Sequence, residues 1–297
     1  MTDFFAKYGY APNKEAVETS LGIIASNLNE VISNAVLKEC FSFMDLTSLH
    51  TADTKDSIIK LVEKVNSLAV DYPDYPNPAS ICVFSNFASV VKAHKNNPEI
   101  HTTVTSGYFP SSQTFLEVKV RECELAVESG ADEVDIVLAL NAFMANDHET
   151  ASYEIRQMKA AIDRVAASQG RRVILKVILE TGLLVTAENI ANASFLAMEA
   201  GADFIKTSTG KVEVNATPVA AFVMCECIRK YYEKTGRMVG FKAAGGISTA
   251  SDAVSYYSIV STILGKNWLD RKYFRLGVSR LANSLMSAIE QKTVVFF

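Results

Sequence analysis

The chain has 297 residues, of which 49% are apolar, and this is enough to bury one large hydrophobic core. Its 29 basic and 33 acidic residues are interspersed and give a formal net charge of -4, which argues against a nucleic-acid-binding face. The first residues lack the basic start and apolar core of a signal peptide, and no apolar run is long enough for a membrane span. We therefore expect a soluble, cytoplasmic protein without a nucleic-acid or membrane partner.

Residues 1–39 are predicted to form an N-terminal helical extension, with one or two helices between residues 13 and 39. We expect this extension either to cap the bottom of the following domain or to contact another subunit, for example in a homodimer. It is not expected to carry the function.

From residue 40 onward, short apolar runs alternate with longer amphipathic segments, which is typical of repeated βα units and a parallel sheet. Strands are predicted near residues 41–45, 81–85, 101–106, 133–140, 173–180, 204–209, 239–244 and 273–277, and helices include residues 112–129, 151–167, 187–200 and 217–234. Because eight such units close a barrel, we predict an α/β fold, a TIM (β/α)8 barrel over residues 40–297.

An internal repeat supports the barrel. Residues 126–135 match residues 197–206, with a helix end, a glycine and a strand start in the same order. The match gives Asp135 and Lys206 equivalent strand positions. A looser copy at residues 236–242 gives Lys242 nearly the same position along its own strand.

Charged residues interrupt three of the predicted strands. Strands of a parallel barrel are covered on both sides, so Asp135, Lys206 and Lys242 each need a reason to be there. One interpretation is a structural ion-pair network, and the other is catalysis, which we favour because all three lie toward strand ends that lead into glycine-rich loops. A lysine amine is nucleophilic only when neutral, and burial together with a neighbouring ammonium lowers its pKa.

Cysteine and histidine give no sign of a metal site. The five cysteines are scattered through apolar segments and fit reduced core thiols, and the four histidines are dispersed without ligand spacing. This absence favours organic chemistry over metal chemistry.

Glycine-rich segments after the last strands predict a phosphate site. Thr207 to Lys211 follow Lys206, Gly245 and Gly246 follow the seventh strand, and Gly277 and Ser279 lead into the last helix. Glycines let backbone N–H groups approach an anion, and barrel enzymes often bind phosphate at this position. Gly245 and Gly246 taken alone fit a plain turn equally well.

The segment Lys206-Thr207-Ser208-Thr209-Gly210-Lys211, followed by Val214-Asn215-Ala216-Thr217, resembles the signature of the deoxyribose-phosphate aldolase family. Residues 241–247, 133–137 and 175–182 resemble, in order, the family's second lysine motif, acidic strand and fifth strand. The resemblance covers about residues 40–290 in order.

The resemblance implies a role for each matching residue. Lys206 would form the Schiff base, and Lys242 and Asp135 would relay protons. The implied substrate-binding residues are Asp45, Thr47, Cys82, Thr207, Gly210, Lys211, Gly245, Gly246, Gly277 and Ser279. A core thiol is an equally good interpretation of Cys82, and Lys176 either lines the site or points away from it.

Two departures from the family pattern stand out. Arg280 follows Ser279 where many relatives have a second small hydroxyl residue, and the C-terminus lacks the tyrosine that some bacterial relatives use in proton transfer.

The implied reaction is the reversible cleavage of 2-deoxy-D-ribose 5-phosphate to D-glyceraldehyde 3-phosphate and acetaldehyde, a step of deoxyribose phosphate and deoxynucleoside catabolism. The partners would be small phosphosugars and aldehydes, with no cofactor. Two alternatives stay open: another lysine-dependent barrel aldolase with a different phosphosugar, and a non-catalytic phosphosugar-binding barrel. The second has no need for two lysines on adjacent buried strands.

Overall fold

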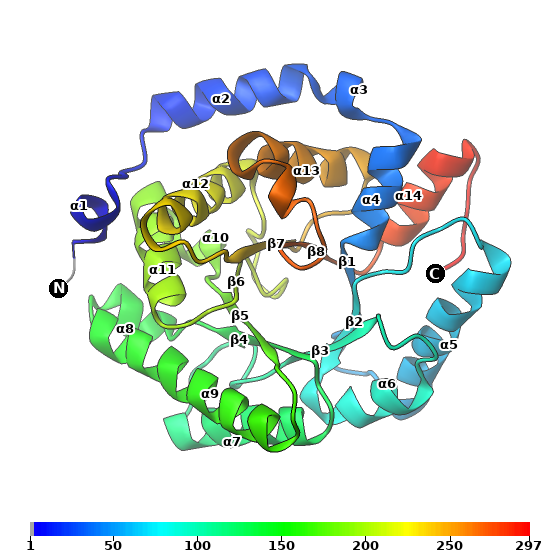
Figure 1. Ribbon diagram of the computed structural model, residues 1–297, viewed down its shortest axis with the longest axis horizontal. Helices are drawn as coiled ribbons and strands as arrows, with labels where there is room; N and C mark the ends of the chain where they lie inside the picture. The colour runs from blue at the N-terminus through cyan, green and yellow to red at the C-terminus, as the bar shows by residue number, and fades with distance from the viewer. Residues whose placement is uncertain (1–2) are drawn as a thin grey trace.

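The computed structural model describes residues 3–297, which form a ring of helices around a barrel of parallel strands (Figure 1). Each strand pairs with the next along the chain and β8 pairs with β1, so the sheet closes without a free edge. The strands of the described residues are β1 (Met44–Thr47), β2 (Ser80–Phe84), β3 (His101–Thr105), β4 (Glu133–Val137), β5 (Ile174–Ile178), β6 (Phe204–Lys206), β7 (Gly240–Ala244) and β8 (Phe274–Val278). The predicted TIM barrel is confirmed.

Helices separate the strands and cover the outside of the barrel. They are α5 (Lys55–Asp71), α6 (Ala88–His94), α7 (Leu116–Glu128), α8 (Leu140–Met144), α9 (His148–Ser168), α10 (Thr181–Leu184), α11 (Ala187–Glu199), α12 (Pro218–Thr235), α13 (Ala250–Leu264) and α14 (Leu281–Glu290), with short 3-10 helices η1 (Ser85–Phe87) and η2 (Lys266–Trp268). Between residues 3 and 297, none of the helices combines the length and the apolar character that a bilayer span requires.

Local sequence signals set several helix ends. Thr54 caps α5 in a reciprocal capping box with Ser57, which satisfies two backbone N–H groups that the helix cannot pair itself. Thr217 caps α12 and Pro218 occupies its first turn, where the missing proline N–H is not needed. Gly236 ends the same helix in the left-handed region, with φ 70°.

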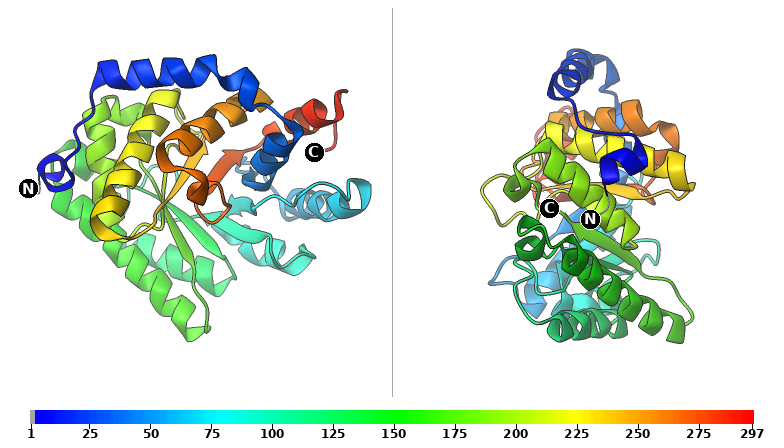
Figure 2. Two further views of the ribbon diagram at one scale, coloured as in Figure 1. Left: turned by 45° about the horizontal axis from the view of Figure 1, so that its top comes forward. Right: turned by 90° about the vertical axis from the view of Figure 1, so that its left-hand side faces the viewer.

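The N-terminal helices lie along the side of the barrel. They are α1 (Phe4–Tyr8), α2 (Lys14–Ser26), α3 (Leu28–Val31) and α4 (Asn34–Ser42). Helix α2 runs outside the ring against α12 and α13, and α4 packs against α13 and α14 (Figures 1 and 2). Helix α2 therefore covers a flank of the barrel and not its bottom, and the expected domain boundary at residue 40 falls inside α4.

Several predicted element boundaries were wrong, although every predicted strand exists. Phe41 lies in the last turn of α4, and β1 begins only at Met44; Leu140 belongs to α8 rather than to β4. Strand β6 ends at Lys206, and α7 begins at Leu116 instead of residue 112. The reason is that a short apolar run looks the same whether it continues a buried strand or starts a helix that packs on the barrel.

We expect Gly240→Ala to destabilise the barrel by about 1–3 kcal/mol, because the introduced methyl group overpacks a filled site. A Cβ at Gly240 would lie 2.3 Å from Cε1 of the Phe204 ring, on the strand that carries Lys206. Gly22→Ala is the matched control, since a Cβ there meets nothing within 4 Å in the middle of α2 and alanine favours the helix. Thermal unfolding should show a lower midpoint only for Gly240→Ala, and equal midpoints for the two variants would contradict the packing argument.

Candidate active site

The carboxylate of Asp135 is the centre of a buried cluster of charged side chains. Its Oδ2 accepts hydrogen bonds from Nζ of Lys206 and from Nζ of Lys242, each at 2.9 Å. Its Oδ1 accepts from Nζ of Lys176 at 3.0 Å. Asp135 is fully buried, so its charge is compensated by these three lysines and not by water.

Strand register brings these groups together. Lys206 of β6 is the direct neighbour of Lys242 on β7, and Asp135 of β4 is the direct neighbour of Lys176 on β5. Residues at the same level of a barrel whose side chains point inward meet at the axis. The expectation that Lys206 and Lys242 lie close together is confirmed by this pairing.

The cluster extends below Asp135 through Arg275 and Glu133, to which the sequence analysis gave no role. Arg275 of β8 donates to Oδ1 of Asp45 at 2.6 Å and to Oε1 of Glu133 at 2.6 Å. Lys176 donates to Glu133 as well, and Lys242 donates to Oδ2 of Asp45 at 2.5 Å. The rule that revealed Asp135 would also have revealed Arg275, because it interrupts the apolar strand Phe274-Arg275-Leu276.

The two site lysines differ in electrostatic surroundings. Burial is the largest effect on Lys206, and together with the Lys242 ammonium it lowers the pKa of Lys206 below its ordinary value, against the opposing attraction of Asp135. Burial also acts on Lys242, but the carboxylates of Asp135 and Asp45 outweigh it and raise the pKa of Lys242. Lys206 is therefore the amine that is more easily neutral, and Lys242 stays protonated.

The carboxylates stay ionised despite their burial. Burial alone would raise the pKa of Asp135, but Lys176, Lys206 and Lys242 together bring it well below its ordinary value. Burial opposes ionisation of Asp45 too, and Lys242 and Arg275 lower the pKa of this carboxyl to about 2.

A cavity of about 220 Å³ opens above Lys206 at the carboxyl ends of the strands. Most of the residues expected to hold substrate and phosphate line this cavity. Two basic residues that were not assigned to the site, His50 and Arg280, line it as well. The predicted residues that line it are Thr47, Lys206, Gly210, Lys211, Gly245, Gly246, Gly277 and Ser279.

Three expected substrate residues lie outside this lining. The hydroxyl of Thr207 donates to the carbonyl of Ala244 at 3.2 Å and accepts from its N–H at 3.0 Å, so it joins the ends of β6 and β7. Asp45 lies in the ion cluster below the cavity. Cys82 is fully buried on β2, and burial raises the pKa of its thiol.

Small residues let the cavity wall approach the cluster. A Cβ on Gly277 would come within 3.0 Å of Cε of Lys242 and 2.9 Å of Cβ of Ala244. Gly245 has a φ of 83°, and its Cβ would lie 2.6 Å from Oδ1 of Asn215. A side chain at either position would collide with the neighbouring residues of the cavity wall, so glycine is required there for steric reasons.

The loop after β6 is held firmly under the cavity. The carboxylate of Glu180 accepts from the backbone N–H of Thr209 at 3.1 Å and from its hydroxyl at 2.5 Å. The Lys211 N–H donates to the Thr209 hydroxyl at 3.0 Å, and Lys211 Nζ donates to the carbonyl of Leu49 at 2.5 Å. Lys211 therefore already bridges to the loop after β1 and presents its ammonium at the cavity.

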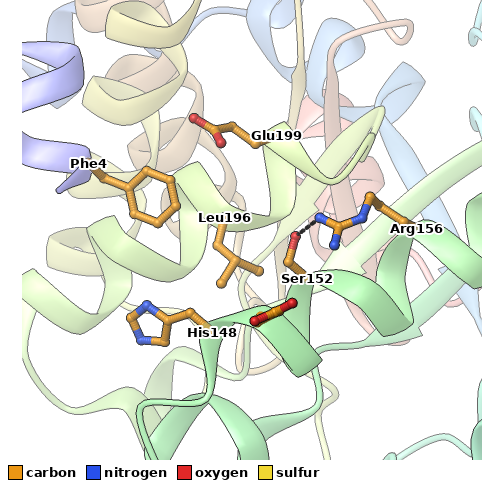
Figure 3. Close-up of a pocket in the computed structure, with 7 residues that line it drawn as sticks. Phe4, His148, Ser152, Arg156, Leu196 and Glu199 are labelled. Atoms are coloured by element: carbon orange, nitrogen blue, oxygen red, sulfur yellow. Dashed lines mark hydrogen bonds between the residues drawn. The ribbon is translucent and has the colours of Figure 1, made fainter. Parts of the chain in front are cut away.

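A second cavity, of about 290 Å³, lies on the outside of the barrel where Phe4 of α1 faces His148 of α9 and Leu196 of α11 (Figure 3). Two carboxylates line it, Glu149 and Glu199, and Glu199 accepts a hydrogen bond from the Tyr8 hydroxyl at 2.8 Å. None of the charged residues clustered around Asp135 lines this cavity. Among residues 3–297, no three His, Cys, Asp or Glu side chains are grouped as a metal ion would need.

Comparisons with known proteins agree with the fold. The family model described as DeoC/LacD family aldolase matches residues 40–266. A Caenorhabditis elegans protein provisionally named deoxyribose-phosphate aldolase is 38% identical over 256 residues, which cover 85% of this chain and 81% of that protein.

Solved structures show the same architecture. The aldolase QR15 is 25% identical and superposes with a TM-score of 0.64 over 84% of this chain and 96% of its own. A deoxyribose phosphate aldolase from Aeropyrum pernix, described as a unique tetramer, is 24% identical, has a TM-score of 0.66 and covers 93% of this chain and 98% of its own. From the family match and the identity to the nematode protein, the chain belongs to the DeoC/LacD family of aldolases.

Proposed function

We propose that this aldolase cleaves 2-deoxy-D-ribose 5-phosphate reversibly into D-glyceraldehyde 3-phosphate and acetaldehyde through a Schiff base on Lys206. The observation that carries the proposal is the position of Lys206. It lines the open cavity while its Nζ shares one oxygen of Asp135 with Lys242. The name of the C. elegans relative supports the choice of substrate.

The first half of the reaction uses Lys206 as nucleophile. Its neutral amine adds to the C1 aldehyde of the open-chain sugar and gives a carbinolamine, which loses water to form a protonated imine. The imine then accepts electrons. Removal of the proton from the C3 hydroxyl breaks the C2–C3 bond, so that C3 becomes the aldehyde of glyceraldehyde 3-phosphate and the electron pair forms an enamine over C1 and C2.

The second half restores the enzyme. The enamine is protonated at C2, and water hydrolyses the resulting imine to acetaldehyde and free Lys206. In this proposal a water between the substrate, Asp135 and Lys242 carries the protons. Lys242 carries a proton because it stays charged, and Asp135 keeps free carboxylate lone pairs because it stays ionised, so the two would hold that water between a donor and an acceptor.

The phosphate would bind at the far side of the cavity, among the glycines of the β7 and β8 loops. Gly245 and Gly246 follow β7, and Ser279 precedes α14, whose first N–H groups favour an anion. Lys211 and Arg280 would add charge-assisted contacts. Binding energy from this remote group helps to hold the reacting carbons near Lys206.

Treatment with borohydride in the presence of acetaldehyde or deoxyribose 5-phosphate should inactivate the enzyme irreversibly, because reduction converts the imine into a stable secondary amine. Peptide mass mapping should find the adduct on Lys206. Lys206→Met is the control and should form no adduct. An adduct on Lys242, or on neither lysine, would remove the basis for the assigned nucleophile.

The rate of trapping should depend on pH through Lys206. The protonated amine cannot attack, so the rate should fall as the pH falls through the pKa of Lys206, which lies below the ordinary value of about 10.5 for lysine. We expect Lys242→Met to move the midpoint upward, since it removes the ammonium that disfavours charge on Lys206. A midpoint that stays the same or moves downward would show that Lys242 does not act on Lys206 in this way.

Lys211→Ala should lower kcat/KM for deoxyribose 5-phosphate by roughly ten- to hundredfold, since a charge-assisted contact is worth about 1.5–3 kcal/mol. The loss on unphosphorylated deoxyribose should be small. Arg280→Ala should show the same selectivity if its guanidinium reaches the phosphate, and Lys230→Ala on the outer face of α12 is the control. Equal losses on both sugars would mean that Lys211 acts only by bridging to Leu49.

A further inference from the structure

The ion cluster inside the barrel has one more cation than it has carboxylates. Its members are linked by contacts of 4.0 Å or less and are almost fully buried, so their charges must balance among themselves. The carboxylates are Asp45, Glu133 and Asp135, and the cations are Lys176, Lys206, Lys242 and Arg275. Loss of one proton from a lysine makes the cluster neutral.

The contacts decide which cation gives up that proton. Arg275 is excluded because a guanidinium keeps its proton in proteins. Lys242 contacts the carboxylates of both Asp45 and Asp135, and Lys176 contacts those of both Glu133 and Asp135.

The ammonium form of Lys206 is the least stabilised of the three lysines. It contacts only the Oδ2 atom of Asp135, which it shares with Lys242, and it is the lysine of the cluster that lines the cavity. Lys206 is therefore the lysine that loses its proton to bring the cluster to neutrality.

Arg275 creates this surplus at a distance from the substrate, and Glu133 limits it to one charge. Arg275 occupies Oδ1 of Asp45 at 2.6 Å, and its other terminal nitrogen occupies Oε1 of Glu133. Glu133 in turn holds Lys176 against Oδ1 of Asp135. Apart from Oδ2 of Asp135, which Lys206 shares with Lys242, the oxygens of the three carboxylates are paired with other cations.

We propose that Arg275 and Glu133 are positioning residues that fix the number of charges in the cluster and so set how readily Lys206 becomes its neutral amine, with Arg275 favouring that amine and Glu133 opposing it. The inference rests on the proposed Schiff base at Lys206. Neither residue needs to touch the substrate, because both act through Lys176, Asp45 and Asp135.

Two other titratable groups face the cluster. Cys82 of β2 is fully buried and stays a neutral thiol, since burial raises its pKa. His101 of β3 contacts Oε1 of Glu133 through Nδ1 at 2.6 Å, and its side chain is 40% exposed at the amino-terminal mouth of the barrel. Measuring each variant also with His101→Gln removes the imidazole from the charge count.

The test measures the pH midpoint of reductive trapping by acetaldehyde and cyanoborohydride in the full-length protein. Arg275→Met removes the surplus cation, so the midpoint for Lys206 should rise by about one pH unit, the effect of a unit charge about 10 Å away at an effective dielectric constant of about 20. Glu133→Gln removes a carboxylate, and the midpoint should fall. The double variant restores the surplus of one cation and should return the midpoint toward that of the unchanged protein.

The proposal would be supported if the two single variants shift the pH midpoint in opposite directions and the double variant restores it. General damage to the fold would not shift the midpoint in opposite directions according to the charge removed. Arg275→Lys keeps the cation and should keep the midpoint. If Arg275→Met does not fold, Glu133→Gln is compared with the double variant, whose midpoint must then be the higher of the two. Midpoints that stay within about 0.3 units would overturn the proposal, whereas absence of any adduct on Lys206 in the unchanged protein would instead overturn the proposed Schiff base.

Discussion

The carboxylate of Asp135 at the axis of a closed barrel is the interaction on which the rest of the site depends. It accepts from three lysines on three strands, and no water is needed to satisfy it. A buried ion of this kind is stable only when its partners are held in place, because removing one of them leaves an uncompensated charge. The barrel provides that restraint, since each strand is paired on both sides and cannot shift its register alone. The electrostatic surroundings of Lys206 are thus a consequence of how the sheet closes.

The upper part of the barrel forms the cavity beside this electrostatic arrangement. Thr207 ties the end of β6 to the end of β7 through Ala244, and Glu180 holds the following loop through Thr209. Gly277 leaves room for the cavity wall to reach Lys242. The loops are therefore supported by residues that need not contact a ligand, which explains why Thr207 matches the family signature without lining the cavity.

The outer flank of the molecule and the interior of the barrel are separate in structure. The N-terminal helices and the outer cavity near Phe4 lie along the flank formed by α9, α11, α12 and α13, whereas the cluster and its cavity lie on the barrel axis. This separation is usual for the fold, in which the ends of the strands toward the carboxyl side carry chemistry and the helices carry stability.

The sequence by itself determined the fold class, the existence of every strand and the residues Asp135, Lys206 and Lys242, because alternating apolar segments and charges within buried strands are visible along the chain. Strand ends could not be read in the same way, as Phe41 and Leu140 show, since an apolar residue fits a strand end and a packed helix equally well. The sequence also gave no pairing for Glu133 and Arg275, which are 142 positions apart. Only closure of the barrel brings β8 against β1 and its arginine to Asp45 and Glu133 across the interior, so the balance of charge that favours a neutral Lys206 was decided by the tertiary structure.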